Sequence, residues 1–271
     1  MALEVTGKLA EDKRNLKEVL TGREVANIVE SVFNKIPPVL SHELVDSNIV
    51  LTLAGIKPVT SFHCSANSST DTEMLHGGIL TLNSLLSKNY PNIRFHLIGQ
   101  PFNKPSGKKE RIQMASVENL QGWERVSSTT KIPGIRAFDS RSGWDGLKRW
   151  HTGVVAHLER VNYERNIPTA EHVPPGRIVL EGLELGYPDQ AIFDFLDYLE
   201  KSRKPSLQDS HIPYTGTYQE HQPNYDFYPE HANNPAIQRN IAECAAVLKD
   251  FYESDWHKKI SPSLDFHRQA D

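Results

Sequence analysis

The sequence predicts an α/β protein with a mainly parallel sheet, helices on both faces, an N-terminal helical pair and a C-terminal loop plus helix. Apolar runs of strand length alternate with amphipathic segments of helix length, an order typical of parallel sheets. Hydrophobic residues make up 38% of the 271 residues and charged residues 24%, as in globular proteins. We expect one domain over 1–271, comprising a helical arm (1–47), an α/β core (48–205), and a long aromatic loop with a closing helix (206–271).

The N-terminal arm shows the pattern of a capped helix. Thr21 and Glu24 have the spacing of a capping box, in which each side chain binds a backbone N–H at the helix start. Apolar residues follow at helical spacing as far as Phe33, and the Pro37-Pro38 pair ends the element.

Two strands and a helix form the first half of the predicted core. The apolar run over 49–54 is typical of a strand covered on both faces. Thr70 and Glu73 repeat the capping spacing before an amphipathic helix that ends at Pro91, and 93–98 forms the next strand. Short joints between these elements predict a βαβ unit with parallel strands.

The remaining elements follow in the same way. A third strand is predicted over 111–117, a helix from Ser142 to Val161, a strand over 177–185, and a helix whose first turn contains Pro188. Residues 202–233 show no apolar period and predict a long loop.

The chain is predicted to close with one more helix. Asn234 is a good N-cap, and Pro235 suits the first helical position. Apolar residues at helical spacing follow as far as Tyr252.

Two adjacent glycines, Gly77 and Gly78, lie inside one predicted helix. Each costs about 1 kcal/mol of helix stability relative to alanine. The pair therefore predicts a close approach to this helix, most simply by the sheet.

Composition excludes several classes of protein. No apolar run approaches the roughly 20 residues that span a bilayer, and the first twenty residues carry charges throughout. Two cysteines are too few for a disulfide framework and suit a reducing compartment, so we expect a cytoplasmic protein without a membrane span. Common dinucleotide, hydrolase, zinc, calcium and P-loop motifs are missing from the sequence.

Charge is unevenly distributed along the chain. Residues 101–150 contain ten basic and five acidic side chains, whereas 171–271 contain nine basic and seventeen acidic ones. The whole-chain pI of 6.3 disfavours a nucleic-acid-binding protein. A few clustered cations can still attract one small anion.

The candidate anion site lies where loops follow predicted strands. Its residues are Lys57, Lys104, Ser106, Lys108, Arg111 and Tyr187. Open α/β sheets bind ligands beyond the carboxyl ends of their strands, so the turn with Lys57 and the basic loop are expected to share one rim. The alternatives are a solvated basic loop and, at Tyr187, a turn that only orients a helix.

His63 and Cys64 are the candidate catalytic residues. A thiol near a helix N-terminus or a histidine can ionise and become nucleophilic. The alternative is that Cys64 is a small buried hydrophobic residue.

These patterns favour an enzyme, of the transferase or hydrolase class, that acts on a small phosphate- or carboxylate-bearing metabolite. One alternative is a non-catalytic module that binds protein through the Tyr-rich segment 206–233. A minor alternative is a metal-dependent enzyme that uses His211, His221 and His231. The sequence identifies no cofactor.

Overall fold

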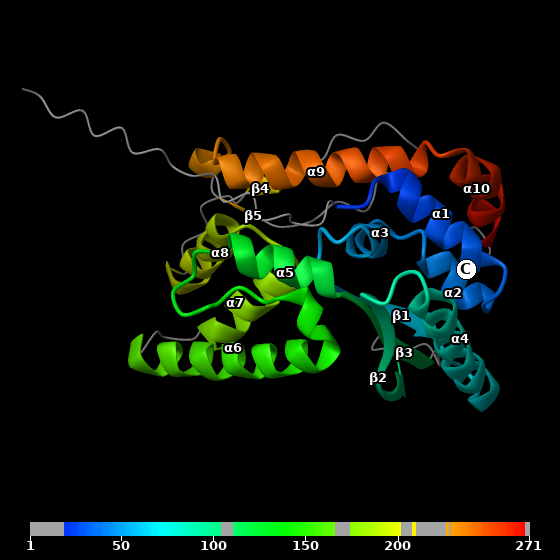
Figure 1. Cartoon of the computed structure of the whole chain (residues 1–271), viewed down its shortest axis with the longest axis horizontal. Coiled ribbons are helices and arrows are strands. Elements are labelled where there is room, and N and C mark those ends of the chain that lie inside the picture. The colour runs from blue at the N-terminus through cyan, green and yellow to red at the C-terminus, as the bar shows by residue number, and fades with distance from the viewer. Residues whose placement is uncertain are drawn as a thin grey trace, which may run out of the picture.

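The computed structural model describes residues 19–103, 111–165, 174–201, 208–209, 226–227 and 229–268. Its helices are α1 (Gly22–Phe33), α2 (Pro38–Glu43), α3 (Ser47–Leu53), α4 (Ser69–Ser87), α5 (Leu120–Thr129), α6 (Gly143–Arg165), α7 (Pro175–Glu184), α8 (Asp189–Lys201), α9 (Pro235–Tyr252) and α10 (Asp255–Arg268). The strands are β1 (Val59–Ser65), β2 (Ile93–Asn103), β3 (Arg111–Asn119), and the short pair β4 (Gln208–Asp209) and β5 (Asp226–Phe227). Helices dominate this fold, and the sheet is confined to one side (Figure 1).

The main sheet has three strands in the order β1-β3-β2, and β3 is antiparallel to both neighbours. The predicted mainly parallel sheet with helices on both faces is therefore wrong. β1 and β2 do point the same way, because each is antiparallel to β3, and α4 connects them. β3 lies between them, so they are not the neighbouring parallel pair that the βαβ pattern predicted.

Two of the predicted strands are helices. Residues 49–54 fall in α3 and its C-cap, and Asp46 caps that helix by accepting hydrogen bonds from the backbone N–H of Asn48 and Ile49. Every residue of α3 except Asn48 is buried, so a helix covered on all sides shows the same continuous apolar run as a buried strand. Residues 177–185 fall in α7 and its C-cap, where Pro175 occupies the first turn.

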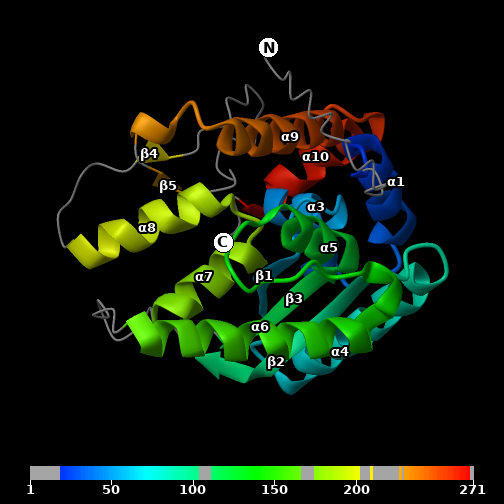
Figure 2. The ribbon, with the colours of Figure 1, turned by 60° about the vertical axis from the view of Figure 1, so that its left-hand side comes forward.

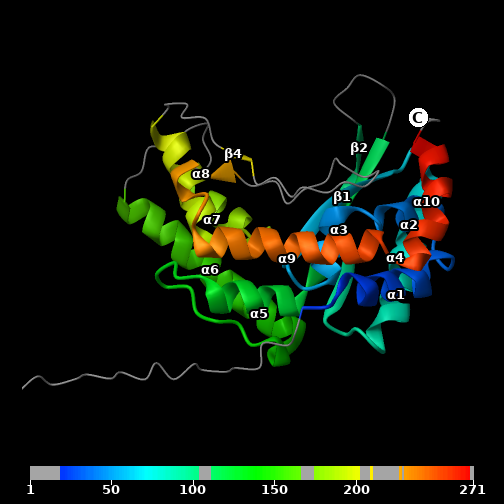
Figure 3. The same cartoon turned by 90° about the horizontal axis from the view of Figure 1, so that it is seen from above.

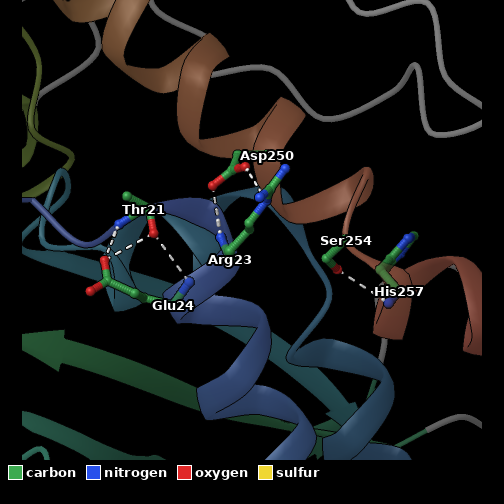
Figure 4. Close-up of polar contacts among 6 residues, drawn as sticks. All are labelled: Thr21, Arg23, Glu24, Asp250, Ser254 and His257. Atoms are coloured by element: carbon green, nitrogen blue, oxygen red, sulfur yellow. Dashed lines mark hydrogen bonds and ion pairs between the residues drawn. The ribbon is translucent and has the colours of Figure 1, made fainter.

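The predicted strands over 93–98 and 111–117 and the five remaining predicted helices after residue 20 are confirmed with small shifts, whereas the arm before residue 19 and most of the predicted loop over 202–233, with its Tyr-rich segment, lie outside the described residues. Thr21 and Glu24 form the predicted capping box of α1, with Thr21 Oγ1 accepting from the Glu24 N–H at 3.2 Å (Figure 4). Asn234 caps α9, with Pro235 at its first position. The capping box of α4 is formed by Ser68 and Asp71, not by the predicted pair two residues further on.

Two apolar clusters hold the elements together. The larger cluster contains residues of the four helices α1, α2, α3 and α4, of one face of the sheet and of the second half of α9. The other lies among α5, α6, α7 and α8. Figure 3 shows α9 running from α8 at one end of the molecule to α10 at the other. The N-terminus of α1 is fixed to α9 by Asp250, which accepts from the Arg23 backbone N–H at 2.9 Å and pairs with its Nε at 3.0 Å (Figure 4).

No helix within the described ranges combines the length and the apolar character needed to cross a bilayer.

The two glycines of α4 have different surroundings. A Cβ at Gly78 would lie 2.6 Å from Leu40 Cδ1 and 2.8 Å from Pro37 Cδ, whereas a Cβ at Gly77 would meet no atom within 4 Å. The predicted close approach is thus made at Gly78, by α2 and the residue before it, not by the sheet.

We expect Gly78→Ala to destabilise the protein by about 1–3 kcal/mol, because the methyl group overlaps the α2 contact. Gly77→Ala is the matched control and should stabilise by about 0.5–1 kcal/mol, since alanine favours a helix and the site has room. Urea unfolding of both variants measures the effects. Equal shifts of the two midpoints would contradict the contact at Gly78.

Candidate functional site

The turn with Lys57 and Arg111, the described end of the basic loop, lie at opposite ends of the sheet. Lys57 is two residues before β1, whose first residue, Val59, pairs with Glu118 near the end of β3. Arg111 begins β3 and lies beside the other end of β1. Seven residues of strand separate the two sites by roughly 20 Å. The expected shared rim is therefore wrong, because the sheet is antiparallel.

The basic loop itself falls largely outside the described residues. Lys104, Ser106 and Lys108 belong to this undescribed part, so their anion-binding role stays a prediction. Arg111 is exposed, and its Nη2 donates to the Pro101 carbonyl at 3.3 Å.

Lys57 is buried, with 3% of its surface exposed. Its Nζ donates a 2.7 Å hydrogen bond to Asn48 Oδ1 in α3 and lies 5.8 Å from the centre of the Tyr187 ring. The structure thus brings together two of the predicted site residues, Lys57 and Tyr187. Asn48, which the sequence did not predict, lies beside them. The contacts with Asn48 and with the Tyr187 ring define the position of the buried Lys57 amine.

Glycines allow other elements to reach the backbone of this turn. A Cβ at Gly122 in α5 would lie 2.4 Å from the Lys57 carbonyl oxygen, and one at Gly186, after α7, would lie 3.0 Å from the Ile56 carbonyl oxygen. Gly186 also has a φ of +73°, which disfavours other residues. Backbone contact from α5 and from the α7–α8 turn therefore encloses Lys57.

Asn119 connects this turn to the sheet and to α5. Its side-chain amide donates to the carbonyls of Thr52 and Leu53 at the end of α3, and its Oδ1 accepts from the Gln121 N–H as the N-cap of α5. The Asn119 backbone N–H donates to the Pro58 carbonyl at 2.8 Å. One buried side chain therefore holds α3, β3 and α5 in register.

Lys57 contributes to the wall of a cavity of about 400 Å³, which lies between the start of β1 and α7. Figure 2 shows α7 between α6 and α8, with one end directed toward β1. We call this cavity the lysine pocket and define it by Asn48, Lys57, Arg177, Glu181, Glu184 and Tyr187. Its volume is in the range of small-molecule sites.

The charged residues of α7 in this pocket are oriented by ion pairs. Arg177 Nε binds Glu181 Oε1 at 3.0 Å, one helical turn away. Glu184 Oε1 lies 3.1 Å from Nε2 of His151 in α6. The pocket therefore contains two cationic side chains and two carboxylates.

Burial lowers the pKa of Lys57 to about 8, because removal from water disfavours the ammonium form. Cys244 in α9 and Asp46 act in the opposite direction with smaller effects. An amine with this pKa is partly unprotonated near neutral pH and can act as a nucleophile or a base.

A second cavity of about 440 Å³ lies among α5, α8 and α9, and Tyr187 also borders it. Arg125 forms an ion pair with Glu243 in its wall, and Asp189 accepts from Thr130 Oγ1 and the Lys131 N–H, whereas the side chains of Lys131 and Arg239 form no ion pair with the described residues. The lysine pocket is the better candidate for chemistry, because it contains the buried amine.

His63 and Cys64 point to opposite faces of β1, since neighbouring strand residues alternate. Cys64 is 1% exposed and faces the core, whereas His63 is exposed. Burial raises the pKa of Cys64 to about 12, so little thiolate exists at neutral pH. The hypothesis that these two residues act in catalysis stays a prediction, and this geometry favours Lys57 instead.

The histidine-based metal hypothesis also stays a prediction. His211 and His221 are not among the described residues. His231 lies with its Nδ1 2.9 Å from both carboxylate oxygens of the buried Asp194. Over the ranges that the structure describes, no group of three or more His, Cys, Asp or Glu side chains is arranged to hold a metal ion.

Sequence reasoning missed Asn48, Arg177, Glu181 and Glu184. The last three are spaced by four and three residues, which places them on one face of a helix. That signal was present in the sequence, but the assignment of this segment to a strand concealed it.

Comparison of the chain with protein-family models, with curated proteins and with solved structures finds no match.

The buried amine predicts a pH-dependent stability. The folded protein favours neutral Lys57, so between pH 8 and about 10.5 the unfolded chain binds more protons and this residue's contribution to the free energy of unfolding rises with pH. We expect Lys57→Met to be more stable than the wild type at pH 7.5, with the advantage shrinking by up to about 3 kcal/mol at pH 10.

Urea unfolding at several pH values measures this difference. The groups that face Lys57, namely Asp46, Tyr187, Arg177, Glu184 and Cys244, are present in both proteins, so most of their titration cancels in the comparison. A stability difference that stays constant across this pH range would contradict a depressed pKa of Lys57.

A further prediction is that the Asn119 side chain contributes more to the free energy of unfolding than a helix cap does. Asn119→Ala should destabilise the protein by about 2–4 kcal/mol, because it removes a cap and also the side-chain donor to the Thr52 and Leu53 carbonyls, of which, within the described ranges, only the Thr52 carbonyl keeps another donor, the Gly55 N–H. Asn234→Ala, which removes only the cap of α9, is the matched control and should cost about 1 kcal/mol. Similar losses in thermal unfolding would show that the α3 contacts contribute nothing.

Proposed function

We propose that this protein is an enzyme that binds a small carboxylate-bearing molecule in the lysine pocket. The observation that carries the proposal is an amine buried in the wall of a cavity and fixed there by Asn48 and Tyr187. Burying a charged amine is unfavourable for folding. A role in ligand binding accounts for its presence better than a structural role does.

The hydrogen bonds of Lys57 support a ligand at this position. An ammonium group has three donors, and the bond to Asn48 is the one hydrogen bond that Lys57 Nζ makes to the described residues. Oxygen atoms of a ligand in the pocket would accept from the others. Arg177, at the wall of the same cavity, adds a guanidinium suited to a carboxylate.

The charge balance of the pocket favours a monocarboxylate over a phosphate. Two cations and two carboxylates leave no net positive charge, so a dianionic phosphate would meet repulsion from Glu181 and Glu184. A ligand with one negative charge and polar groups elsewhere avoids this repulsion. Of the two ligand classes that the sequence predicts, phosphate-bearing and carboxylate-bearing metabolites, we therefore propose the carboxylate-bearing class.

Glu184 and His151 supply an acid–base pair. The Glu184 carboxylate lies 3.1 Å from the half-buried imidazole of His151, and a carboxylate–imidazole pair of this kind can transfer a proton to or from a ligand. Together with Lys57, this pair gives the pocket a nucleophile and a proton carrier, which is why we favour an enzyme over a simple binding protein.

A thermal-shift screen with small carboxylates and phosphates tests the proposal. A carboxylate present at about 100 times its Kd should stabilise the wild type by about 2.7 kcal/mol. Lys57→Met should abolish the shift. Arg160→Ala, which removes an exposed cation of α6 that borders neither cavity, should retain it. A shift that survives Lys57→Met, or one produced by phosphates alone, would refute a carboxylate site at this lysine.

A further inference from the structure

We propose that Lys57 forms an imine with the carbonyl group of a small oxo acid whose carboxylate is bound by Arg177. This inference rests on the proposed function and names its substrate class and the chemical role of the lysine.

The position of Lys57 suits covalent chemistry. Asn48 and the face of the Tyr187 ring hold Nζ at the cavity wall, so the amine is positioned for attack before a ligand arrives. Burial keeps bulk water away from the nitrogen, which slows hydrolysis of an imine. Burial also lowers the pKa of this amine, and the unprotonated fraction needed for attack is therefore present near neutral pH.

The orientation of Arg177 suits the carboxylate of such a substrate. Its Nε donates to Glu181 Oε1 at 3.0 Å, in an i,i+4 ion pair whose two side chains are about half exposed. Its terminal nitrogens make no hydrogen bond to the part of the chain that the structure describes, and they can accept a carboxylate in a bidentate manner. An oxo acid carries both groups, a carbonyl for the lysine and a carboxylate for the arginine.

The step needs no oxidant or reductant. The nitrogen lone pair of Lys57 attacks the carbonyl carbon and forms a C–N bond, and the carbonyl oxygen takes up a proton. This first proton is the one that Nζ releases. A second proton, taken up from solvent, lets that oxygen leave as water, and the positively charged iminium ion remains. Glu184, bonded to His151, is the group in the pocket that takes the proton released from Nζ and returns it to the departing oxygen.

Reductive trapping tests the inference on the full-length wild type. The protein is incubated with glyoxylate or pyruvate and sodium borohydride, which reduces an imine to a stable amine, and the adduct is mapped by peptide mass spectrometry. Lys57 should be labelled on the order of 100-fold faster than the exposed Lys249, because a pKa of about 8 leaves far more of the Lys57 amine unprotonated near pH 7.5 than the ordinary lysine value of 10.5 would. Lactate, which has no carbonyl group, should give no adduct.

The role of Arg177 is tested by comparing two carbonyl probes. Arg177→Ala should slow labelling of Lys57 by glyoxylate about tenfold or more, because a charge-assisted contact is lost. Labelling by acetaldehyde, which has no carboxylate, should be unchanged. Equal effects on both probes would contradict a carboxylate contact at Arg177.

The outcomes separate this inference from the proposed function. If pyruvate and lactate both stabilise the protein but borohydride labels Lys57 no faster than Lys249, the imine is refuted and carboxylate binding stands. If neither acid stabilises the protein and Lys57 is not selectively labelled, both proposals are refuted. Selective labelling of Lys57 by the oxo acids alone supports the imine.

Discussion

Backbone contact around the Lys57 turn is the constraint on which the other elements depend. Because Gly122 and Gly186 have no side chain, α5 and the α7–α8 turn both pack directly against the backbone of residues 56 and 57. Asn119 then fixes the end of α3 to the start of α5. The contact at Gly186 places the C-terminal end of α7 beside the Lys57 turn, and Arg177, Glu181 and Glu184 of α7 line the lysine pocket.

Burial has opposite consequences for the amine and the thiols of this protein. Removal from water lowers the pKa of Lys57 to about 8 and raises the pKa of Cys64 and Cys244 to about 12. In each case the neutral form is favoured. A neutral amine is the nucleophilic form, whereas a neutral thiol is the unreactive form. Burial therefore favours the reactive form of the lysine and the unreactive form of both cysteines. For this reason the geometry gives little support to Cys64 as the nucleophile.

The sequence was informative where a local signal determines the structure. The capping box of α1, the Asn-Pro start of α9 and the apolar period of α6 each depend on residues within one or two turns, and all three were predicted correctly. Prediction failed for α3 because burial on all sides removes the helical period, and that burial depends on α1, the sheet and α9. When the segments of α3 and α7 are interpreted as strands, strands and helices alternate along the sequence, which is the order typical of a parallel α/β fold.

The site was partly predictable for a related reason. Lys57 and Tyr187 stood out because both lie in turns, but the rule that places ligands at the carboxyl ends of parallel strands pointed to the wrong partner. In this antiparallel sheet the pocket forms at the beginning of β1, where α7, a helix of the second apolar cluster, supplies part of its wall. The uneven charge of the chain has a structural explanation as well. Arg125, from the basic stretch, pairs with Glu243 of the acidic stretch across α5 and α9. At least this cation of the basic stretch is therefore paired with a distant part of the chain, and a charge count along the sequence cannot distinguish such a contact from an anion site.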